Sequence, residues 1–301
     1  MQGPDILQTF PLPPRARERA AALARAGRGP EDWRWLAAAL ALYLEPRLNS
    51  GPGPLVVGIG GGQGAGKSTL ARLLVEALCA LGRRAATASI DDFYLTRAGR
   101  LALAASVHPL LATRGVPGTH DLALLQTTLD ALAREGTVRL PRFDKGADDR
   151  SPSAAWPEVE APLEVFVLEG WCLGAQAAPA ARLREPINAL EAEEDRDGAW
   201  RRYVNAALAG PYAELWQRVD FWVFLAVPDL AAVRRWRAEQ EQALPPPQRM
   251  GDAALARFIA HYQRITEQML GRWARADSPA DLLVTLDESH RAVALQLRAA
   301  H

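Results

Sequence analysis

A short apolar strand that runs directly into a glycine-rich turn and a helix most constrains how this chain folds. Residues Leu55–Gly60 precede Gly61-Gly-Gln-Gly-Ala-Gly-Lys-Ser68, and an apolar helical pattern follows over Ser68–Ala80. The segment fits Gly-x-x-x-x-Gly-Lys-Ser with a strand before it and a helix after it, the context that makes the motif specific. Its glycines let several backbone N–H groups point at one place, and the helix start adds a positive dipole end. The sequence therefore predicts a cradle for phosphate groups.

The motif also indicates which groups hold a nucleotide. Lys67 is expected to reach the β- and γ-phosphates of ATP, and the Ser68 hydroxyl is expected to ligate Mg²⁺. The residues expected to contact the nucleotide are Gly61, Gly62, Gln63, Gly64, Ala65, Gly66, Lys67, Ser68 and Thr69. Guanine-specific switch proteins usually carry Asn-Lys-x-Asp, and neither lysine of this chain lies in such a sequence. An ATP-driven motor would normally add an arginine finger and oligomer-building modules, which the sequence does not obviously carry.

Short apolar runs alternate with helical patterns after this point, which is typical of a parallel sheet covered by helices. The runs are nearly continuous, as expected for strands buried on both faces. Strands are predicted over Leu55–Gly60, Arg84–Ile90, Val138–Phe143, Val165–Leu168, Phe221–Val227 and Leu282–Leu286. Helices are predicted over Ser68–Ala80, Leu122–Arg134, Trp200–Trp216, Leu230–Gln242 and Ala253–Trp273. We expect an α/β fold with a mainly parallel sheet, helices on both of its faces and one catalytic domain over residues 51–301.

Residues 1–50 are expected to form a helical N-terminal extension. An Ala/Arg-rich helix is predicted over Arg15–Ala26, and a second helix over Glu31–Leu44 begins with two acidic residues at its positive end. Apolar residues recur at helical spacing in the second helix, which predicts that it packs against the rest of the molecule. They are Trp33, Leu36, Leu40 and Leu44.

Charge and composition limit the classes of partner. The chain has 35 basic and 35 acidic residues, so its formal net charge is zero, and no segment concentrates basic residues as a nucleic-acid groove would. No window approaches the roughly 20 apolar residues that span a bilayer. Two cysteines, Cys79 and Cys172, are too few for a disulfide framework. We expect a cytoplasmic protein that binds neither nucleic acid nor membrane, and the oligomeric state stays open.

The basic residues are strongly biased, because 33 are arginines and only Lys67 and Lys145 are lysines. Lysine is a compact, mobile point charge, whereas the guanidinium of arginine is a broad planar fork. Such a chain is expected to keep lysine where arginine will not serve. Lys67 lies in the phosphate-binding motif, and the same steric argument favours a functional role for Lys145.

Two carboxylates follow the second predicted strand, in the sequence Ser89-Ile-Asp-Asp-Phe-Tyr94. The carboxyl ends of strands are where open α/β sheets bind ligands. Phosphoryl transfer to an alcohol needs a carboxylate there to orient the attacking hydroxyl and accept its proton. Adjacent strand residues point to opposite faces, so only one of Asp91 and Asp92 can face the γ-phosphate. The alternative is a pair of solvated loop acids.

Further polar groups are candidates for the metal and the acceptor. Glu169 ends a buried apolar run, where a carboxylate without a partner would be costly, and phosphate-bound Mg²⁺ is its expected partner. A helix-capping role before Gly170 is the alternative. A Gly/Pro-rich loop offers a cation and hydrogen-bonding groups to a polar acceptor, and a strand end offers a second set. These residues are Arg114, His120 and Asp121 in the loop, and Asp144, Lys145, Asp149 and Arg150 after the strand end.

The order of these motifs resembles the phosphoribulokinase and uridine kinase superfamily, in which Asp-x-Phe-Tyr carries the catalytic base. The resemblance implies that Asp91 is the base and that Asp92 and Tyr94 contact the acceptor. Several segments are also similar to one branch, the D-glycerate 3-kinase family and its bacterial relatives. They are Arg114-Gly-Val-Pro-Gly-Thr-His-Asp121, Pro141-Arg-Phe-Asp-Lys-Gly146, Leu168-Glu-Gly-Trp171 and Trp236-Arg-Ala-Glu-Gln-Glu241. Together with the phosphate-binding motif they cover residues 55–270.

The resemblance further implies a helical lid over residues 229–251, whose arginines close on the phosphates and stabilise charge in the transition state. The motif favours Arg237, and a solvated basic helix face is the alternative. The relatives have Gly-Met after the lid, whereas this chain has Met250-Gly251. The acidic segment 188–200 is expected to be a solvated insertion, and His108, which precedes a proline, is expected to be structural.

These observations predict a P-loop kinase that transfers the γ-phosphoryl group of ATP, with Mg²⁺, to a hydroxyl of a small metabolite. The resemblance implies that the acceptor is D-glycerate and the product 3-phosphoglycerate. A kinase for a nucleoside or a pantothenate-like acceptor is one alternative. A regulatory P-loop ATPase without a small-molecule acceptor is the other.

Overall fold

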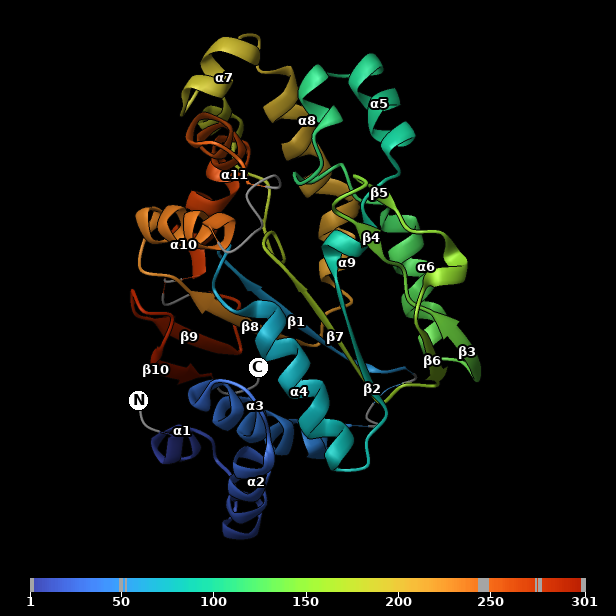
Figure 1. Ribbon diagram of the computed structural model, residues 1–301, viewed down its shortest axis with the longest axis vertical. Helices are drawn as coiled ribbons and strands as arrows, with labels where there is room; N and C mark the ends of the chain where they lie inside the picture. The colour runs from blue at the N-terminus through green and yellow to red at the C-terminus, as the bar shows by residue number, and fades with distance from the viewer. Residues whose placement is uncertain are drawn as a thin grey trace.

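One six-stranded sheet crosses the molecule and carries helices on both faces (Figure 1). The computed structural model describes residues 3–48, 51, 53–242, 249–273, 275 and 278–298. The strand order is β10-β9-β8-β1-β7-β2, and every neighbouring pair is parallel except β10 with β9. The strands are β1 (Leu55–Gly61), β2 (Ala85–Ser89), β7 (Val165–Gly170), β8 (Phe221–Ala226), β9 (Leu282–Leu286) and β10 (Ala292–Leu297). The predicted α/β fold with a mainly parallel sheet is confirmed.

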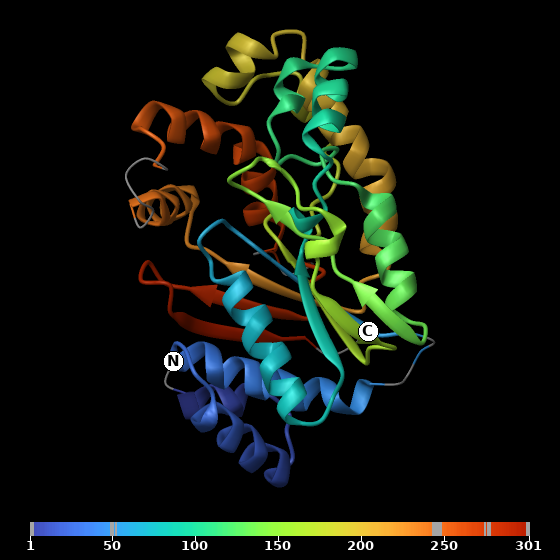
Figure 2. The ribbon, with the colours of Figure 1, turned by 45° about the vertical axis from the view of Figure 1, so that its right-hand side comes forward.

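Helices cover the two faces of this sheet as separate layers (Figure 2). The layer that includes the N-terminal helices consists of α1 (Gly3–Thr9), α2 (Pro14–Ala26), α3 (Glu31–Leu44) and α4 (Lys67–Ala80), with α10 (Leu230–Gln242) at its edge. The opposite layer is built from α6 (Leu122–Leu132), α8 (Ala199–Ala207), α9 (Ala213–Trp216) and α11 (Asp252–Trp273), with α5 (Arg97–Ser106) and α7 (Ala189–Glu194) above it. Among the described residues, no helix combines the length and the apolarity that a bilayer crossing requires.

Alternation along β1 explains why both faces of the sheet are buried. Val57 and Ile59 pack with the N-terminal helices and α4, whereas Val56 packs with the opposite layer. Successive side chains of a strand point to opposite faces, so a strand covered on both sides is apolar throughout. Gly58 leaves room for its neighbours, because a Cβ atom there would lie 2.9 Å from the ring of Trp222. Large side chains of β8 thus fill the space above the middle of β1.

The N-terminal helices share one core with the sheet. Every residue of α3 from Leu36 to Leu44 is buried, and α3 packs along α4. Helix α1 contacts β10 at the edge of the sheet, and Ile6 and Phe10 have no exposed surface. The predicted packing of the second helix against the rest of the molecule is therefore present. The N-terminal extension is part of the core rather than a separate unit.

The predicted strand Val138–Phe143 is wrong as a strand of the main sheet. Its residues divide between two small antiparallel pairs, in which β3 (Gly136–Arg139) pairs with β6 (Glu158–Ala161) and β4 (Phe143–Asp144) pairs with β5 (Asp149–Arg150). Pro141 lies between them, and proline cannot donate a hydrogen bond to a sheet. The apolar residues of this stretch cover the sheet rather than join it.

One predicted helix differs from the structure, and the predicted lid is described only in part. The helix predicted over Trp200–Trp216 is interrupted by a π-helical turn over Leu208–Tyr212, where Gly210 leaves helical dihedral angles and Pro211 lacks an N–H. The predicted lid, residues 229–251, contains α10, while its residues 243–248 lie outside the described part of the chain. Whether this segment closes over a ligand stays a prediction.

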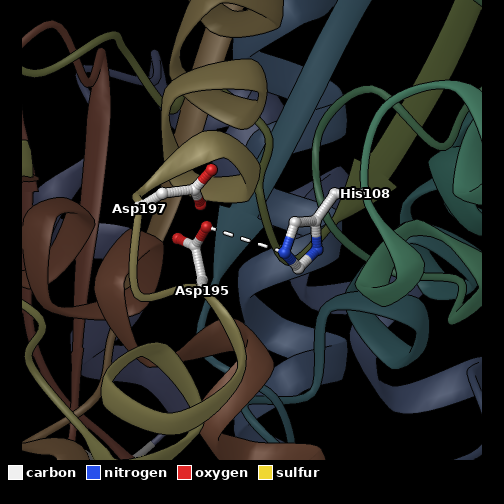
Figure 3. Close-up of side chains that lie close together, drawn as sticks. All are labelled: His108, Asp195 and Asp197. Carbon is white, nitrogen blue, oxygen red and sulfur yellow. Dashed lines mark ion pairs between the residues drawn. The ribbon is translucent and has the colours of Figure 1, made fainter.

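The acidic segment 188–200 is not a wholly solvated insertion, because Glu191 and Asp195 have no exposed surface. Asp195 accepts hydrogen bonds from the backbone N–H groups of Trp200 and Arg201, at 2.8 and 3.1 Å, and pairs with the Arg201 guanidinium. His108 Nε2 lies 3.8 Å from Asp195 Oδ1 (Figure 3). Buried carboxylates are stable only with such partners. The expectation is therefore wrong for these two acids, which anchor α7 and α8 to their surroundings.

Asp197 lies near this pair, and the three side chains His108, Asp195 and Asp197 are close enough to be considered as metal ligands (Figure 3). Both carboxylate oxygens of Asp195 already accept hydrogen bonds. His108 Nδ1 accepts a hydrogen bond from the N–H of Leu110, at the start of a short 3₁₀ helix. These contacts support the structural role expected of His108.

Candidate active site

The phosphate-binding loop joins the carboxyl end of β1 to the start of α4. Gly66 adopts a φ of +88°, a left-handed conformation that favours glycine, and α4 begins at Lys67 directly after it. The buried ammonium of Lys67 donates a hydrogen bond of 2.8 Å to the carbonyl oxygen of Gly62. Burial lowers the pKa of Lys67, whereas the charges of Glu169 and Asp91 act to raise it. The lysine is therefore folded back into a cradle that already contains its countercharges.

Bulky aromatic side chains support this loop from behind. A Cβ atom on Gly64 would lie 2.6 Å from Cβ of Trp236 in α10, and Gly64 itself has a φ of +79°. A Cβ atom on Gly66 would lie 3.0 Å from the indole ring of Trp33 in α3. His290 stacks on Trp236 and makes a hydrogen bond with the carbonyl oxygen of Gly64. Glycine is thus required twice, for backbone conformation and for close packing.

Ser68 and Glu169 form the candidate metal site. The Ser68 hydroxyl donates a hydrogen bond of 2.8 Å to Glu169 Oε1, which joins the start of α4 to the end of β7. Burial raises the pKa of Glu169, and the positive charge of Lys67 opposes this effect. A buried carboxylate beside a hydroxyl is the kind of oxygen donor set that Mg²⁺ prefers. The two predicted metal ligands therefore lie together and fit the ion.

Asp91 lies at the end of β2, in a short 3₁₀ helix over Ile90–Phe93. Its Oδ2 accepts a hydrogen bond of 2.8 Å from Nζ of Lys145, and its Oδ1 accepts one of 2.9 Å from the hydroxyl of Tyr94. Burial alone would raise the pKa of Asp91, but the charge and hydrogen bond of Lys145 outweigh it, so the pKa is lowered. Asp91 is therefore an oriented carboxylate that stays ionised.

Asp92 has different partners from Asp91 and holds the local backbone in place. It accepts hydrogen bonds from the N–H groups of Ser89 and Phe143, at 3.2 and 3.3 Å, and pairs with the Arg142 guanidinium at 3.2 Å. These contacts join the end of β2 to β4. The sequence argument that only one of the two neighbouring acids can face the cradle agrees with this divergence. A direct contact between Asp92 and a substrate stays a prediction.

A buried histidine lies beside the candidate base. His120 stacks on Tyr94 with ring centroids 4.5 Å apart, and its Nδ1 is hydrogen-bonded to the hydroxyl of Tyr212. The Tyr212 hydroxyl accepts from the N–H of Gly118, so its own proton is free for Nδ1 and the His120 proton lies on Nε2. Burial lowers the pKa of His120 to about 4, although the charge of Asp91 opposes this. His120 is therefore neutral, and its Nε2 is buried without a hydrogen-bond partner among the described residues.

The other predicted acceptor residues make contacts within the protein. Arg114 pairs with Asp148 and donates a hydrogen bond of 3.2 Å to the carbonyl oxygen of Lys145. Asp121 caps α6 by accepting from the N–H of Leu124 and also pairs with Arg150. The exposed Asp144 accepts from the N–H groups of the two residues after Lys145. Arg114 and Asp144 thus hold the loop that presents Lys145, and their contact with an acceptor stays a prediction.

Arg237, the predicted lid arginine, lies on α10. Its guanidinium pairs with the buried carboxylate of Glu241 and lies over the ring of Phe258, 4.8 Å from its centroid. The second oxygen of Glu241 accepts a hydrogen bond of 3.0 Å from the N–H of Met250. These contacts hold Arg237 against its own helix and against α11. Its movement onto a phosphate group stays a prediction.

The structure brings the core of the predicted site together from four elements. Lys67 and Ser68 come from the start of α4, Asp91 follows β2, Glu169 ends β7, and Lys145 reaches in from the β4–β5 loop. Sequence reasoning missed Tyr212, which fixes the tautomer of His120, and the supporting pair of Trp236 and His290. The nearest sequence signal was Trp236 as the first residue of a family-like segment, with no indication that it contacts Gly64.

A cradle for phosphates, two oxygen ligands for Mg²⁺ and an ionised carboxylate at the next strand end define a P-loop kinase for small molecules. Residues 56–177 match the Phosphoribulokinase / Uridine kinase family. Two curated relatives support the match. A chloroplastic D-glycerate 3-kinase of Arabidopsis thaliana is 36% identical over 66% of this chain and 44% of its own length. The uncharacterized kinase mug58 of Schizosaccharomyces pombe is 31% identical over 77% of this chain and 87% of its own length.

The chain therefore belongs to the phosphoribulokinase and uridine kinase family. Among solved structures, the D-glycerate 3-kinase of Cryptococcus neoformans is similar, with a TM-score of 0.68 and 28% identity over 93% of this chain and 96% of that one. The alignment with the Arabidopsis kinase spans less than half of that relative's length. Family membership implies ATP as the phosphoryl donor.

Proposed function

We propose that this protein is a kinase that uses ATP and Mg²⁺ to phosphorylate a hydroxyl group of a small hydroxy acid, with D-glycerate as the acceptor and 3-phosphoglycerate as the product. One observation carries the proposal. An ionised carboxylate, Asp91, is oriented by Tyr94 and Lys145 and acts electrostatically on Lys67 of the phosphate cradle. A kinase for an alcohol needs a carboxylate of this kind to orient the attacking hydroxyl and take its proton.

Each residue of the site has its own role in the proposed phosphoryl transfer. The acceptor oxygen forms a bond to the γ-phosphorus while the bond from that phosphorus to the β–γ bridging oxygen breaks, and ADP leaves. Asp91 orients the attacking hydroxyl and takes its proton, which suits a carboxylate within hydrogen-bond reach of an alcohol. Lys67 stabilises negative charge on the transferred group. Ser68 and Glu169 hold Mg²⁺, which neutralises phosphate charge when bound.

The cationic surroundings of Asp91 favour an acidic acceptor. Lys145 lies 2.8 Å from Asp91, and Arg114, which pairs with Asp148, contacts the backbone of Lys145, so both basic side chains belong to the loop beside the base. Lysine and arginine are the side chains that hold a carboxylate. The neutral His120 adds a hydrogen-bond donor, Nε2, in the same region. The names of the Arabidopsis and Cryptococcus relatives, both D-glycerate 3-kinases, agree with this preference.

An acceptor panel tests the proposal, with ADP release from Mg·ATP as the readout. D-glycerate is expected to stimulate ADP release well above the rate without acceptor, with 3-phosphoglycerate as the product. D-lactate is the matched control, because it lacks only the hydroxyl at carbon 3, and it should not stimulate. Stimulation by uridine or pantothenate instead would identify a different kinase. ADP release that no acceptor changes would identify an ATPase.

Substitution of the two neighbouring acids tests the assignment of the base. Asp91→Asn should bind ATP with unchanged affinity and lose acceptor-dependent turnover by about 10²- to 10⁴-fold, the usual contribution of general base catalysis. Asp92→Asn is the control. It weakens contacts to the backbone of Ser89 and Phe143, so a lower melting temperature and a smaller loss of turnover are expected. Equal losses in the two variants would contradict the assignment.

A further inference from the structure

A cavity that contains no residue of the phosphate cradle lies beside α11. It has a volume of about 570 Å³ and is formed between the C-terminal half of α11 and the loop that follows β7. Its lining includes residues 175–179 and the arginines Arg182, Arg264, Arg272 and Arg275. It shares no residue with the candidate active site. The volume is sufficient for a small metabolite.

The charge of the cavity is unbalanced. Arg264 is neutralised by the buried carboxylate of Glu191, with which it makes hydrogen bonds of 2.8 and 2.5 Å. Glu267 is the acid of the lining, and it accepts a hydrogen bond from Gln263. In the described part of the chain, neither Arg182 nor Arg272 has an ion pair or a side-chain hydrogen bond. Two uncompensated guanidinium groups therefore face one cavity, an arrangement that attracts anions.

Two buried polar atoms at the cavity lack partners as well. Nε of Arg272 and Oε1 of Gln268 have almost no exposed surface, and neither makes a hydrogen bond with any described residue. Leaving such buried atoms unsatisfied destabilises the protein. Arg272 requires an acceptor and Gln268 requires a donor. A ligand that carries an anionic group and a hydroxyl satisfies both atoms.

We propose that this cavity is a second binding site, which takes a small organic anion that carries carboxylate or phosphate groups together with a hydroxyl. Arg182 and Arg272 bind the anionic group, because the guanidinium fork matches the oxygens of either. Gln268 accepts a hydrogen bond from the hydroxyl. The site is independent of the proposed function, since it uses no residue of the phosphate cradle or the acceptor region.

Calorimetric titration in Mg²⁺-free buffer tests the site, with citrate and inorganic phosphate as probes. Citrate carries carboxylates and a hydroxyl, whereas phosphate carries the anionic group alone. Citrate is expected to bind wild-type protein more tightly than phosphate does, and Arg272→Gln or Arg182→Gln should weaken it at least about tenfold. Arg72→Gln removes one exposed charge from α4, distant from the cavity, and should leave binding unchanged.

A variant of the phosphate cradle separates the two sites. Lys67→Ala is expected to lose ATP binding and to keep the citrate affinity of the wild type, while Arg272→Gln keeps the wild-type KM for ATP. Tricarballylate, which is citrate without its hydroxyl, bound as tightly as citrate would show that the hydroxyl contributes nothing and would overturn the role of Gln268. No citrate binding, or citrate binding that Lys67→Ala abolishes and Arg272→Gln does not, would overturn the site itself.

Discussion

The ion pair between Asp91 and Lys145 is the contact on which the proposed acid–base chemistry depends. Asp91 is 21% exposed and its partner 63% exposed, so an acceptor can reach the pair from solvent. The ammonium keeps the carboxylate ionised despite its burial. Lys145 therefore sets the pH range over which Asp91 can accept a proton.

Removing the ammonium should move the acid limb of the pH–rate profile. Burial raises the pKa of Asp91, and the charge of Lys145 lowers it below the ordinary value. In Lys145→Met the largest opposing effect is lost and the hydrogen bond from Tyr94 remains, so the pKa of Asp91 rises and the base becomes protonated at a higher pH. The acid limb of kcat/KM is expected to shift to higher pH, as measured across pH 4–9.

Lys145→Arg is the control for this experiment. It keeps the positive charge, so its acid limb should stay near that of the wild type even if turnover falls because the broader guanidinium fits poorly. Identical acid limbs in the wild type and Lys145→Met would show that Asp91 does not titrate in the reaction. His120 should not contribute above pH 5, because its pKa is about 4.

At this scale, the residues that could be predicted were those with a local motif or an anomalous position. Lys67 and Ser68 lie in a motif, and Glu169 was conspicuous as an acid at the end of an apolar run. Tyr212 could not be predicted, since it lies 92 residues from His120 and in a π-helical turn that no periodic pattern indicates. Its role depends on a tertiary contact alone.

Among the elements, α10 and the phosphate-binding loop are packed so closely that they act as one unit. Gly64 and Gly82 allow a direct test, because they have φ angles of +79° and +78°. Alanine at either position adds about 1–2 kcal/mol of backbone strain. At Gly64 the new methyl group also collides with Trp236, whereas nothing lies within 4 Å of it at Gly82.

Gly64→Ala is therefore expected to weaken ATP binding by roughly tenfold or more, since a displaced loop loses hydrogen bonds to phosphate worth about 1.5–3 kcal/mol each. Gly82→Ala should lower the melting temperature, because it introduces the same backbone strain, and it should leave ATP affinity unchanged. Fluorescence titration with a nucleotide analogue measures both affinities. Unchanged affinity in Gly64→Ala would show that α10 does not constrain the loop.

The elements that could be predicted were those with a strong pattern of their own. Helix α10 begins and ends where the sequence indicated, and five of the six predicted strands lie in the main sheet. Strand β10 was missed because Ala292–Leu297 is rich in alanine and leucine, which favour helix, and only its pairing with β9 makes it extended. The prediction for Val138–Phe143 was wrong for a different reason. An apolar run does not show whether a segment joins the main sheet or covers it.

In the molecule as a whole, the N-terminal helices contribute to the nucleotide site. Trp33 and Trp35 of α3 are 5% and 6% exposed, but only Trp33 touches the phosphate-binding loop, at Gly66, while Trp35 packs against Gly3 of α1. Truncating such a side chain to alanine costs about 3–5 kcal/mol of folding stability. Leucine retains part of the contact and is the safer substitution.

Trp33→Leu and Trp35→Leu are expected to lower the melting temperature by similar amounts. Only Trp33→Leu should also raise the KM for ATP several-fold, because Gly66 then loses its support. Thermal denaturation and initial rates at varied ATP concentration give both quantities. If the KM for ATP rose equally in both variants, the effect would reflect general loosening of α3 rather than the contact with Gly66.

The loop between β1 and α4 is held from behind by Trp33, near one end of the chain, and by His290, near the other. During synthesis on the ribosome, residues 69–290 must follow the glycine-rich segment before its last support exists. A nascent chain that ends before His290 contains the whole phosphate-binding motif but lacks one of the residues that support it. The order of translation thus delays a competent nucleotide site until His290 has been added to the chain.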